Sequence, residues 1–528
     1  MRAPPQARAR RVAFGLMIAT LVGACSSPAP DASATPEPPR EVTVTVVDRT
    51  NETTPIPNAQ VTVGASTATT GADGIATVTA SRGASVEASA AGFDPGAGEV
   101  PEQGGLTIAL RPNVVSGTVT NGDGQPIAAV RVFVEGTPVA VETDAQGRYA
   151  LAGVPEQGTL IYKMPGYQLG VIPIDDQMTK DVALTPFQAR AIYTPAAIFE
   201  GAGRLDEQLD LIERTEVNAM VIDVKETNGN LYWATDLAAA AAVGAVMEQP
   251  LLALDDVLPK LKAQGIYTIA RMVVMKDNTL GRQRPELAVN NVATGEPWRD
   301  YGGGVWLDPY NPGVAEYIAA LAGDLADKGF DEVQLDYVRF FSDGDYALAD
   351  TNLPNTQSFR LPAIRRLFRL VSDALVTKRA FLSADVFPIS FIATDDQGIG
   401  QRPEVIMPYV DYFSPMVYPS HYGPFSFGFE VPNNHPYDVI DKTLEIMNEQ
   451  RAGLRMVIRP WIQDFGYGPF PPYTAAQVLE EMRAASDNGA EGWMIWNAVA
   501  HFTTAALGPP RDGEASAPIT SAQPAPGS

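Results

Sequence analysis

One stretch decides the fold predicted for this chain: FDEVQLDYVRF, residues 330–340. Val333 and Leu335 alternate with Gln334 and Asp336, which is the two-residue period of a β-strand. A segment with helical spacing and a glycine stop leads into the stretch, and Asp336 stands where the strand should end. A carboxylate framed by apolar neighbours is costly to bury unless it has a function. In a barrel of alternating strands and helices, the carboxyl ends of the strands form the face that carries active sites.

The same alternation continues on both sides of this stretch. Apolar runs typical of strands recur at residues 191–193, 219–224, 267–271, 333–336, 380–385, 410–418, 454–459 and 492–496. Segments with helical spacing lie between them, at residues 205–214, 255–264, 314–328, 359–377, 438–449 and 475–488. About eight strand–helix units predict an α/β domain over residues 188–508, a (β/α)8 TIM barrel.

Residues 41–187 have a different pattern, in which short alternating runs are separated by Asp-Gly turns. The order of these runs repeats once, which indicates two copies of one small module. We therefore predict two all-β sandwiches, at residues 41–112 and 113–187. Glycine supplies the positive φ of the turns and aspartate caps them, so these residues need no catalytic explanation.

The first 24 residues have the pattern of a secretory signal. Arginines precede an apolar segment at residues 12–22, which is too short to span a membrane comfortably. The segment ends in VGAC with Cys25, the sole cysteine, and this ending resembles a bacterial lipobox. The resemblance implies a lipidated cysteine, a membrane anchor and a location in the cell envelope, outside the cytoplasm; an ordinary secretory signal is the alternative. Residues 25–40 predict a flexible tether, and residues 509–528 a disordered tail.

Composition excludes several classes of function. Of the 528 residues 45% are apolar, enough for large cores, and the formal charge is −24 with no basic run after the first dozen residues. That balance argues against nucleic acid as a partner. One cysteine allows no disulfide framework, and three histidines (His421, His435 and His501) make a His-rich metal centre unexpected. We expect no metal and no cofactor.

Polar and aromatic side chains follow the predicted barrel strands. In chain order they are Asp223, Glu226, Arg271, Asp336, Arg339, Asp385, Tyr418, His421, Arg459, Trp461, Gln463, Trp496 and Asn497. Such a set at one mouth suits a carbohydrate, because sugar rings stack on aromatic side chains and hydroxyls need polar partners. Glycosidic cleavage needs one ionised and one protonated carboxyl, about 5–5.5 Å apart for retention or roughly 6.5–9.5 Å for inversion. A salt bridge from Asp336 to Arg339 or Arg271, and tryptophans buried in the core, are the structural alternatives.

Four motifs stand in the order of a known family: GFDEVQLDYVRF at residues 329–340, LSADVF at 382–387, FSPMVYPSHY at 413–422 and GWMIWN at 492–497. Together they resemble the bacterial putative glycoside hydrolase domain of unknown function, which is placed near the α-amylase-type barrels. Residues 113–187, with GQPI at 124–127 and TDAQGRY at 143–149, similarly resemble the carboxypeptidase regulatory-like domain, and residues 41–112 resemble a degenerate copy of it.

The barrel resemblance implies roles for individual residues. Asp336 falls at the position of the nucleophile or base, and Asp385 at that of the acid/base. The chain departs from α-amylase-type enzymes in having Gln334 where they have an arginine, and aspartate rather than glutamate at 385. Asp223 and Glu226 therefore stay open as alternative acids. The other strand-end residues, Arg271, Arg339, Tyr418, His421, Arg459, Trp461, Gln463, Trp496 and Asn497, are candidates for substrate binding.

These observations lead to one hypothesis and one rival. The hypothesis is a membrane-anchored extracytoplasmic glycoside hydrolase acting on a polysaccharide or oligosaccharide. The rival is a non-catalytic carbohydrate-binding or cell-envelope scaffold lipoprotein. The separation of Asp336 and Asp385 discriminates between them, since carboxyl groups more than about 10 Å apart would weaken the hydrolase hypothesis. A metal-dependent deacetylase is disfavoured by the scarcity of histidine.

Overall fold

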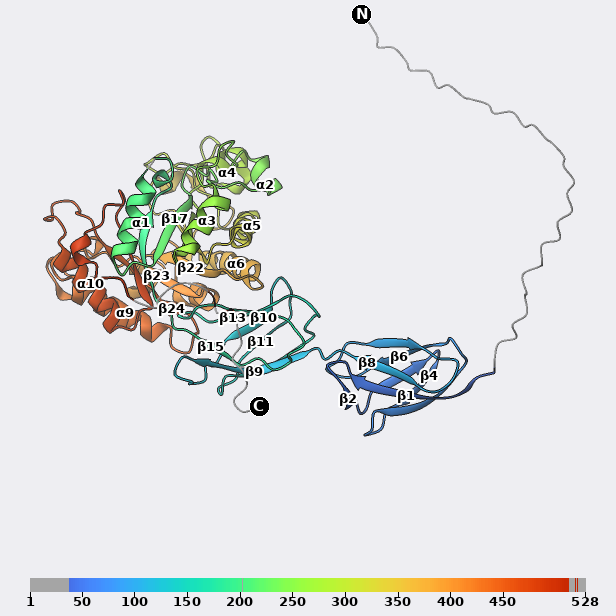
Figure 1. The fold of residues 1–528 in the computed structure, drawn as a ribbon. Coiled ribbons are helices and arrows are strands. Elements are labelled where there is room, and N and C mark those ends of the chain that lie inside the picture. Colours follow the sequence, from blue (N-terminus) through green and yellow to red (C-terminus); the bar gives the residue numbers. More distant parts are fainter. Residues whose placement is uncertain (1–37, 202, 512–517, 519, 521–528) are drawn as a thin grey trace, which may run out of the picture. The chain divides into compact units, whose positions relative to one another are not determined.

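The computed structural model describes residues 38–201, 203–511, 518 and 520 (Figure 1). The predicted signal and Cys25 lie outside these residues, as do most of the predicted tether and tail. The chain divides into two compact units, Met1–Arg111 and Pro112–Ser528. Within the described ranges, no helix has both the length and the apolar character needed to cross a membrane.

The first unit is an all-β module of two four-stranded sheets. One sheet contains β1 (Arg40–Asp48), β2 (Asn51–Pro55), β5 (Ile75–Ala80) and β8 (Leu106–Leu110). The other contains β3 (Gln60–Val63), β4 (Ser66–Thr69), β6 (Ser85–Ser89) and β7 (Gly96–Glu99). Every second residue of β5 and β6 is buried, so each sheet turns one face to a shared core that includes Val42, Val61 and Val86. The predicted β-sandwich is confirmed.

A second all-β module opens the second unit. Its sheets are β11 (Ala140–Glu142), β10 (Arg131–Val134), β13 (Thr159–Lys163) and β14 (Gly170–Pro173), and β12 (Arg148–Ala152), β9 (Val114–Asn121) and β15 (Val182–Leu184). The hydroxyls of Tyr149 on β12 and Tyr162 on β13 lie 2.7 Å apart, and this hydrogen bond joins the two sheets through the core. The buried ring pair satisfies its own polar groups, since Tyr149 Oη also donates to the Lys180 carbonyl.

The barrel is a parallel sheet with eight positions. Its strands are β16 (Ala189–Thr194), β17 (Ala219–Lys225), β18 (Tyr267–Val273), β20 (Glu332–Asp336), β22 (Phe381–Val386), β23 (Tyr412–Pro415), β24 (Val457–Ile458), β25 (Trp461–Gln463) and β26 (Gly492–Trp496). The seventh position is split at Pro460, which has no N–H to donate. Of its halves, β24 pairs with β23 and β25 pairs with β26, while β26 also pairs with β16. A bridge between Met416 and Trp461 closes the ring.

Helices surround this sheet, as Figure 1 shows for α1, α3, α5 and α6. The long ones are α1 (Arg204–Arg214), α3 (Leu254–Ala263), α5 (Pro312–Lys328), α6 (Gln357–Leu375), α9 (Pro436–Gln450) and α10 (Ala475–Asp487). Short ones are α2 (Ala238–Ala242), α4 (Asn278–Gln283), α7 (Ile389–Ile392) and α8 (Pro403–Ile406). The remaining elements are the strand pair β19 (Asn290–Asn291) and β21 (Ala349–Asp350) and the 3-10 turns η1 (Ala196–Ile198), η2 (Pro285–Leu287), η3 (Tyr346–Leu348), η4 (Met407–Tyr409), η5 (Pro419–His421), η6 (Ser426–Gly428), η7 (Pro432–Asn434) and η8 (Thr504–Ala506).

The helix before β20 has clear start and stop signals. The Asn311 side chain accepts from the N–H of Gly313 at the amino end, and Pro312 occupies the first turn. Gly329 ends α5 with a φ of 102°, a conformation that glycine adopts without a steric penalty. The strand therefore starts where the sequence predicts it.

All five residues of β20 are buried, but on two different faces. Val333 and Leu335 pack in the large apolar cluster that joins the barrel to its helices. The alternate residues contact other strands instead: Glu332 pairs with Arg459, the Gln334 amide lies 3.3 Å from Met494 Sδ, and Asp336 pairs with Arg271. The barrel interior thus holds a column of polar side chains, which ends at Asp336.

The second β module packs against the amino ends of barrel strands. Lys163 at the end of β13 donates to the carbonyl of Ala380 at 2.5 Å and pairs with Asp411 at 3.3 Å. The N–H of Gly166 donates to the Tyr412 hydroxyl at 3.0 Å. Ala380 and Asp411 immediately precede β22 and β23, so this module covers the face opposite the carboxyl ends of the strands.

Candidate active site

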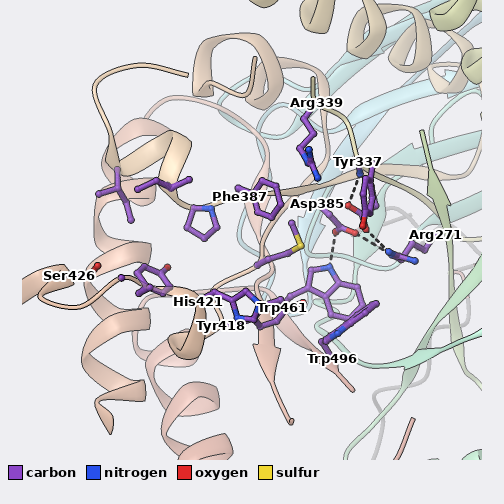
Figure 2. A pocket seen from close by; sticks show the side chains of 17 residues that line it. Arg271, Tyr337, Arg339, Asp385, Phe387, Tyr418, His421, Ser426, Trp461 and Trp496 are labelled. Atoms are coloured by element: carbon purple, nitrogen blue, oxygen red, sulfur yellow. Dashed lines mark hydrogen bonds and ion pairs between the residues drawn. The ribbon is translucent and has the colours of Figure 1, made fainter. Parts of the chain in front are cut away.

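A cavity of about 530 Å³ opens at the carboxyl ends of the barrel strands. Its lining residues are Arg271, Asp336, Tyr337, Arg339, Asp385, Phe387, Pro388, Ile389, Ile392, Met416, Tyr418, His421, Tyr422, Gly423, Ser426, Trp461 and Trp496. Figure 2 shows these side chains converging from several strands and from the loops that follow them. The cavity has two kinds of wall, a charged one with two carboxylates and an apolar one that follows β22 and β23.

Arg271 organises the charged wall. Its Nη2 donates to Asp336 Oδ2 and its Nη1 to Asp223 Oδ1, both at 2.5 Å. Burial alone would lower the pKa of Arg271, but the carboxylates of Asp223 and Asp336 outweigh it and raise the pKa well above its usual value. Arg271 is therefore a fixed positive charge between two strands.

The arginine comes from a neighbouring strand. The barrel resemblance places an arginine at position 334, where this chain has Gln334. In the parallel pairing of β18 with β20, Gln334 is the register partner of Arg271. The neighbouring strand thus supplies the guanidinium that faces Asp336.

The turn after β20 fixes the other oxygen of Asp336. Tyr337 has a φ of 54°, unusual for a residue with a side chain, and its N–H donates to Asp336 Oδ1 at 2.6 Å. Together with Arg271 this bond holds both carboxylate oxygens of Asp336, so the side chain has one orientation toward the cavity.

Asp385 is the second carboxylate of the cavity and is 1% exposed. It accepts a hydrogen bond from Trp461 Nε1 at 2.7 Å, and its Oδ2 lies 3.8 Å from Arg271 Nε (Figure 2). Burial and the nearby charge of Asp336 raise the pKa of Asp385 well above its usual value. Because Asp336 and Asp385 both contact one guanidinium, which spans only a few ångströms, their carboxyl groups lie within the roughly 10 Å that the hydrolase hypothesis requires.

Neither of the alternative acids lines the cavity. Asp223 is fully buried and is held by Arg271 and by the Tyr193 hydroxyl, and it does not line the cavity. Glu226 follows β17 and is also absent from the lining. Burial and a hydrogen bond with Asp223 raise the pKa of Glu226 to about 7. The structure therefore brings Asp385, rather than Asp223 or Glu226, next to Asp336 in the cavity.

Aromatic rings form part of the wall. Trp496 is partly exposed and packs against Tyr193, with 4.1 Å between the ring centroids. The Arg271 Cζ lies 5.2 Å from the centroid of the Trp496 ring. Tyr418 and His421 line the cavity after β23, with ring centroids 5.5 Å apart. Trp461 is only 1% exposed, so little of its ring is free for stacking. Its contribution to the site is the N–H that donates to Asp385. Of the two tryptophans, Trp496 has the accessible ring.

Three predicted binding residues lie outside the cavity. Arg459 is fully buried in an ion pair with Glu332, at the amino end of β20. Gln463 accepts from the N–H of Ser420, and its amide donates to the carbonyl of Phe465. Asn497 donates to the carbonyls of Asp464 and His501 and so organises a loop. All three side chains thus have partners within the protein.

Several lining residues do not follow from the strand-end pattern alone. Phe387, Pro388, Ile389 and Ile392 belong to the short segment after β22 that includes α7, and they form the apolar wall. Tyr193, which holds Asp223 but does not line the cavity, is an aromatic residue after an apolar run near the end of β16, so the rule used for the other strands could have found it. Among the described residues, no group of three or more His, Cys, Asp or Glu side chains could hold a metal ion.

Comparison with known proteins assigns the barrel to a family. A family model described as "Putative glycosyl hydrolase domain" matches residues 191–502. The chain belongs to this family. A carboxypeptidase regulatory-like domain model matches residues 114–190. Both resemblances inferred from the sequence are thus confirmed, and the family match supports a hydrolase role with a carbohydrate substrate.

Three individual proteins are similar to parts of this chain. A hypothetical protein from Ruminiclostridium thermocellum is 32% identical, with 37% of this chain and 97% of that chain covered and a TM-score of 0.33. The PgaB (BpsB) glycoside hydrolase domain from Bordetella bronchiseptica is 13% identical, with 61% and 99% covered and a TM-score of 0.45. TonB-dependent receptor P39 of Formosa agariphila is 39% identical over 70 residues, which are 13% of this chain and only 7% of the receptor.

Proposed function

We propose that this family member is an extracytoplasmic, membrane-anchored glycoside hydrolase that cleaves a polysaccharide or oligosaccharide with Asp336 and Asp385. One observation carries the proposal: two aspartates from neighbouring strands contact the same guanidinium in one cavity, and the pKa of one of them, Asp385, is raised by burial and by the other. Glycosidic cleavage needs one carboxyl group protonated and the other ionised.

In the proposed reaction Asp385 is the general acid. Its raised pKa keeps the proton available for the leaving glycosidic oxygen, and Trp461 Nε1 orients the carboxyl group. Asp336, paired with Arg271, is the ionised carboxylate that either attacks the sugar or activates a water molecule. The accessible ring of Trp496 would stack against the sugar and hold it between the two carboxyl groups.

Substitution of the carboxylates tests the reaction. We expect Asp336→Asn and Asp385→Asn to lower the release of reducing ends from a responsive polysaccharide by at least about a hundredfold, because each removes one acid–base group. A panel of envelope and plant polysaccharides would identify the responsive substrate. Asp373→Asn, on the exposed side of α6, is the matched control and should keep full activity. Unchanged activity of a folded Asp336→Asn protein would overturn the proposed role.

The anchor is proposed from the sequence alone. Cys25 would carry the acyl chains, and residues 25–40 would hold the folded part away from the membrane. We expect the wild-type protein in the membrane fraction and Cys25→Ser in the soluble periplasmic or secreted fraction. A Cys25→Ser protein that stays with the membrane would contradict lipidation at this residue.

A further inference from the structure

Arg339 lines the same cavity but lacks the partners that Arg271 has. Its side chain is 8% exposed, and it makes no ion pair with any carboxylate of the described residues. Burial accordingly lowers the pKa of Arg339, in contrast to Arg271. Burying an arginine without an acidic partner is costly, so a guanidinium kept in this state at a cavity wall suggests a ligand.

The surroundings of Arg339 leave one edge of its guanidinium free. Its Cζ lies 4.8 Å from the ring centroid of Trp306 and 5.0 Å from those of Tyr337 and Phe387. Nη1 donates to the carbonyl of Phe340 at 3.1 Å and to Ser342 Oγ at 2.9 Å. Nε and Nη2 make no hydrogen bond with any described residue. Figure 2 shows the Arg339 side chain extending from the wall of the cavity on the side of Tyr337 and Asp385.

A free Nε–Nη2 edge has a specific chemical preference. Two parallel N–H donors in one plane match the two oxygens of a carboxylate, sulfate or phosphate group better than a single sugar hydroxyl. The formal charge of the whole chain is −24, which repels acidic polymers at long range. A local guanidinium inside the cavity would offset that repulsion at the sugar that is bound.

We propose that Arg339 binds an anionic substituent of the sugar, so that the substrate of this site is an acidic glycan. The inference rests on the proposed hydrolase function, because it names the substrate class of the same cavity. Arg339 contacts the substrate's substituent and takes no part in the acid–base steps of Asp336 and Asp385.

Binding of matched sugars tests the inference. Titration calorimetry of the purified protein would compare glucuronate and galacturonate oligosaccharides with their methyl esters, and neutral oligosaccharides with their 6-sulfated forms. The methyl ester removes the charge of the carboxylate and adds one methyl group. The sulfated pair shows whether the site prefers a sulfate group to a carboxylate. We expect wild-type protein to bind at least one acidic form about tenfold more tightly than its neutral counterpart, equivalent to about 1.4 kcal/mol.

Two variants and one control complete the experiment. Arg339→Gln should abolish the preference for the acidic form, and Arg339→Lys, which keeps the charge but loses the planar fork, should reduce it. Arg365→Gln removes an exposed arginine of α6 and should leave the preference unchanged. Thermal unfolding would show whether the variants fold. If Arg339→Gln does not fold, a reduced preference for the acidic form in Arg339→Lys tests the inference in its place.

Equal affinity of the wild-type protein for all charged and neutral pairs would overturn the inference, as would a preference that survives in Arg339→Gln. Cleavage of acidic glycans at the same rate by wild type and Arg339→Gln would also overturn it, while leaving the hydrolase proposal intact. A charge preference lost in Arg339→Gln, together with no cleavage of any glycan, would instead support the binding role and count against hydrolysis.

Discussion

The Trp461–Asp385 contact is the residue-scale feature that sets the working range of the proposed acid. The indole N–H donates to the ionised carboxylate, which favours the charged form and opposes the effects of burial and of Asp336 on the pKa of Asp385. A general acid must be protonated, so activity should fall as the pH rises through this pKa.

We therefore expect Trp461→Phe to shift the alkaline limb of the activity profile to higher pH. Loss of the donor destabilises the Asp385 carboxylate, so the pKa of Asp385 rises and the side chain stays protonated to higher pH. Rate against pH on a responsive glycan measures the shift. Trp493→Phe, in the apolar cluster between barrel and helices, is the control and should leave the limb in place. A limb that moves to lower pH would show that Asp385 is not the group that titrates.

Residue roles could be predicted from the sequence where they depend on position along a strand. Asp336 ends β20, Asp385 is the next-to-last residue of β22, and both line the cavity. Pairing of Arg271 with Asp336 depends on the register of two strands that are 65 positions apart in the chain, which periodicity does not specify. Periodicity therefore does not show that Arg271 supplies the guanidinium missing at position 334. The pairing of β18 with β20 shows it.

At the scale of elements, the ion pair between Glu332 and Arg459 connects the fourth barrel strand to the split seventh. Both side chains are fully buried, and Glu332 also accepts from the Tyr267 hydroxyl at 3.0 Å. The Arg459 guanidinium lies 4.1 Å from the Tyr412 ring centroid. A buried pair of this kind is sensitive to the loss of one partner, since the other charge then remains in an apolar interior.

We expect Arg459→Met to lower the free energy of unfolding by roughly 3–5 kcal/mol. The double variant Glu332→Gln with Arg459→Met should recover more than half of that loss, because no charge is left unpaired and the amide keeps a partner in Tyr267. Urea denaturation measures both. A single variant within about 1 kcal/mol of wild type would contradict the importance of the pair, and a selective rise in KM without destabilisation would return Arg459 to substrate binding.

Elements were predictable to the extent that local pattern decides them. Six long helices and the strands between them follow the predicted order, because caps such as Asn311 and stops such as Gly329 act locally. The predicted strand at residues 454–459 is instead shortened to Val457–Ile458, with β25 following after Pro460, and the one at 410–418 is shortened to Tyr412–Pro415. Where these strands begin and end depends on their pairing with neighbouring strands, which the sequence pattern of a single strand does not reveal.

For the whole molecule, the grouping of the second β module with the barrel gives it a role beyond that of a spacer. The two share one compact unit, and Lys163 from the module is buried among barrel groups, at Ala380 and Asp411. Arg379 of the barrel also holds Glu135 of the module through two hydrogen bonds, at 2.6 and 2.7 Å. Pattern alone predicted two copies of one module, the first of them degenerate; the contacts of the second module with the barrel follow only from tertiary structure.

Calorimetry of the intact chain should therefore show two unfolding transitions, one for the first unit and one in which the second module and the barrel unfold together. Lys163→Met should lower the midpoint of the larger transition only. The expected loss is roughly 2 kcal/mol, below that of an unshared buried pair, because Arg455 still lies 3.5 Å from Asp411. Lys180→Met, which removes the partner of Asp175 within the module, is the matched control for a buried lysine that does not reach the barrel. Three separate transitions, or a Lys163→Met shift confined to a small module transition, would show that the module folds independently of the barrel.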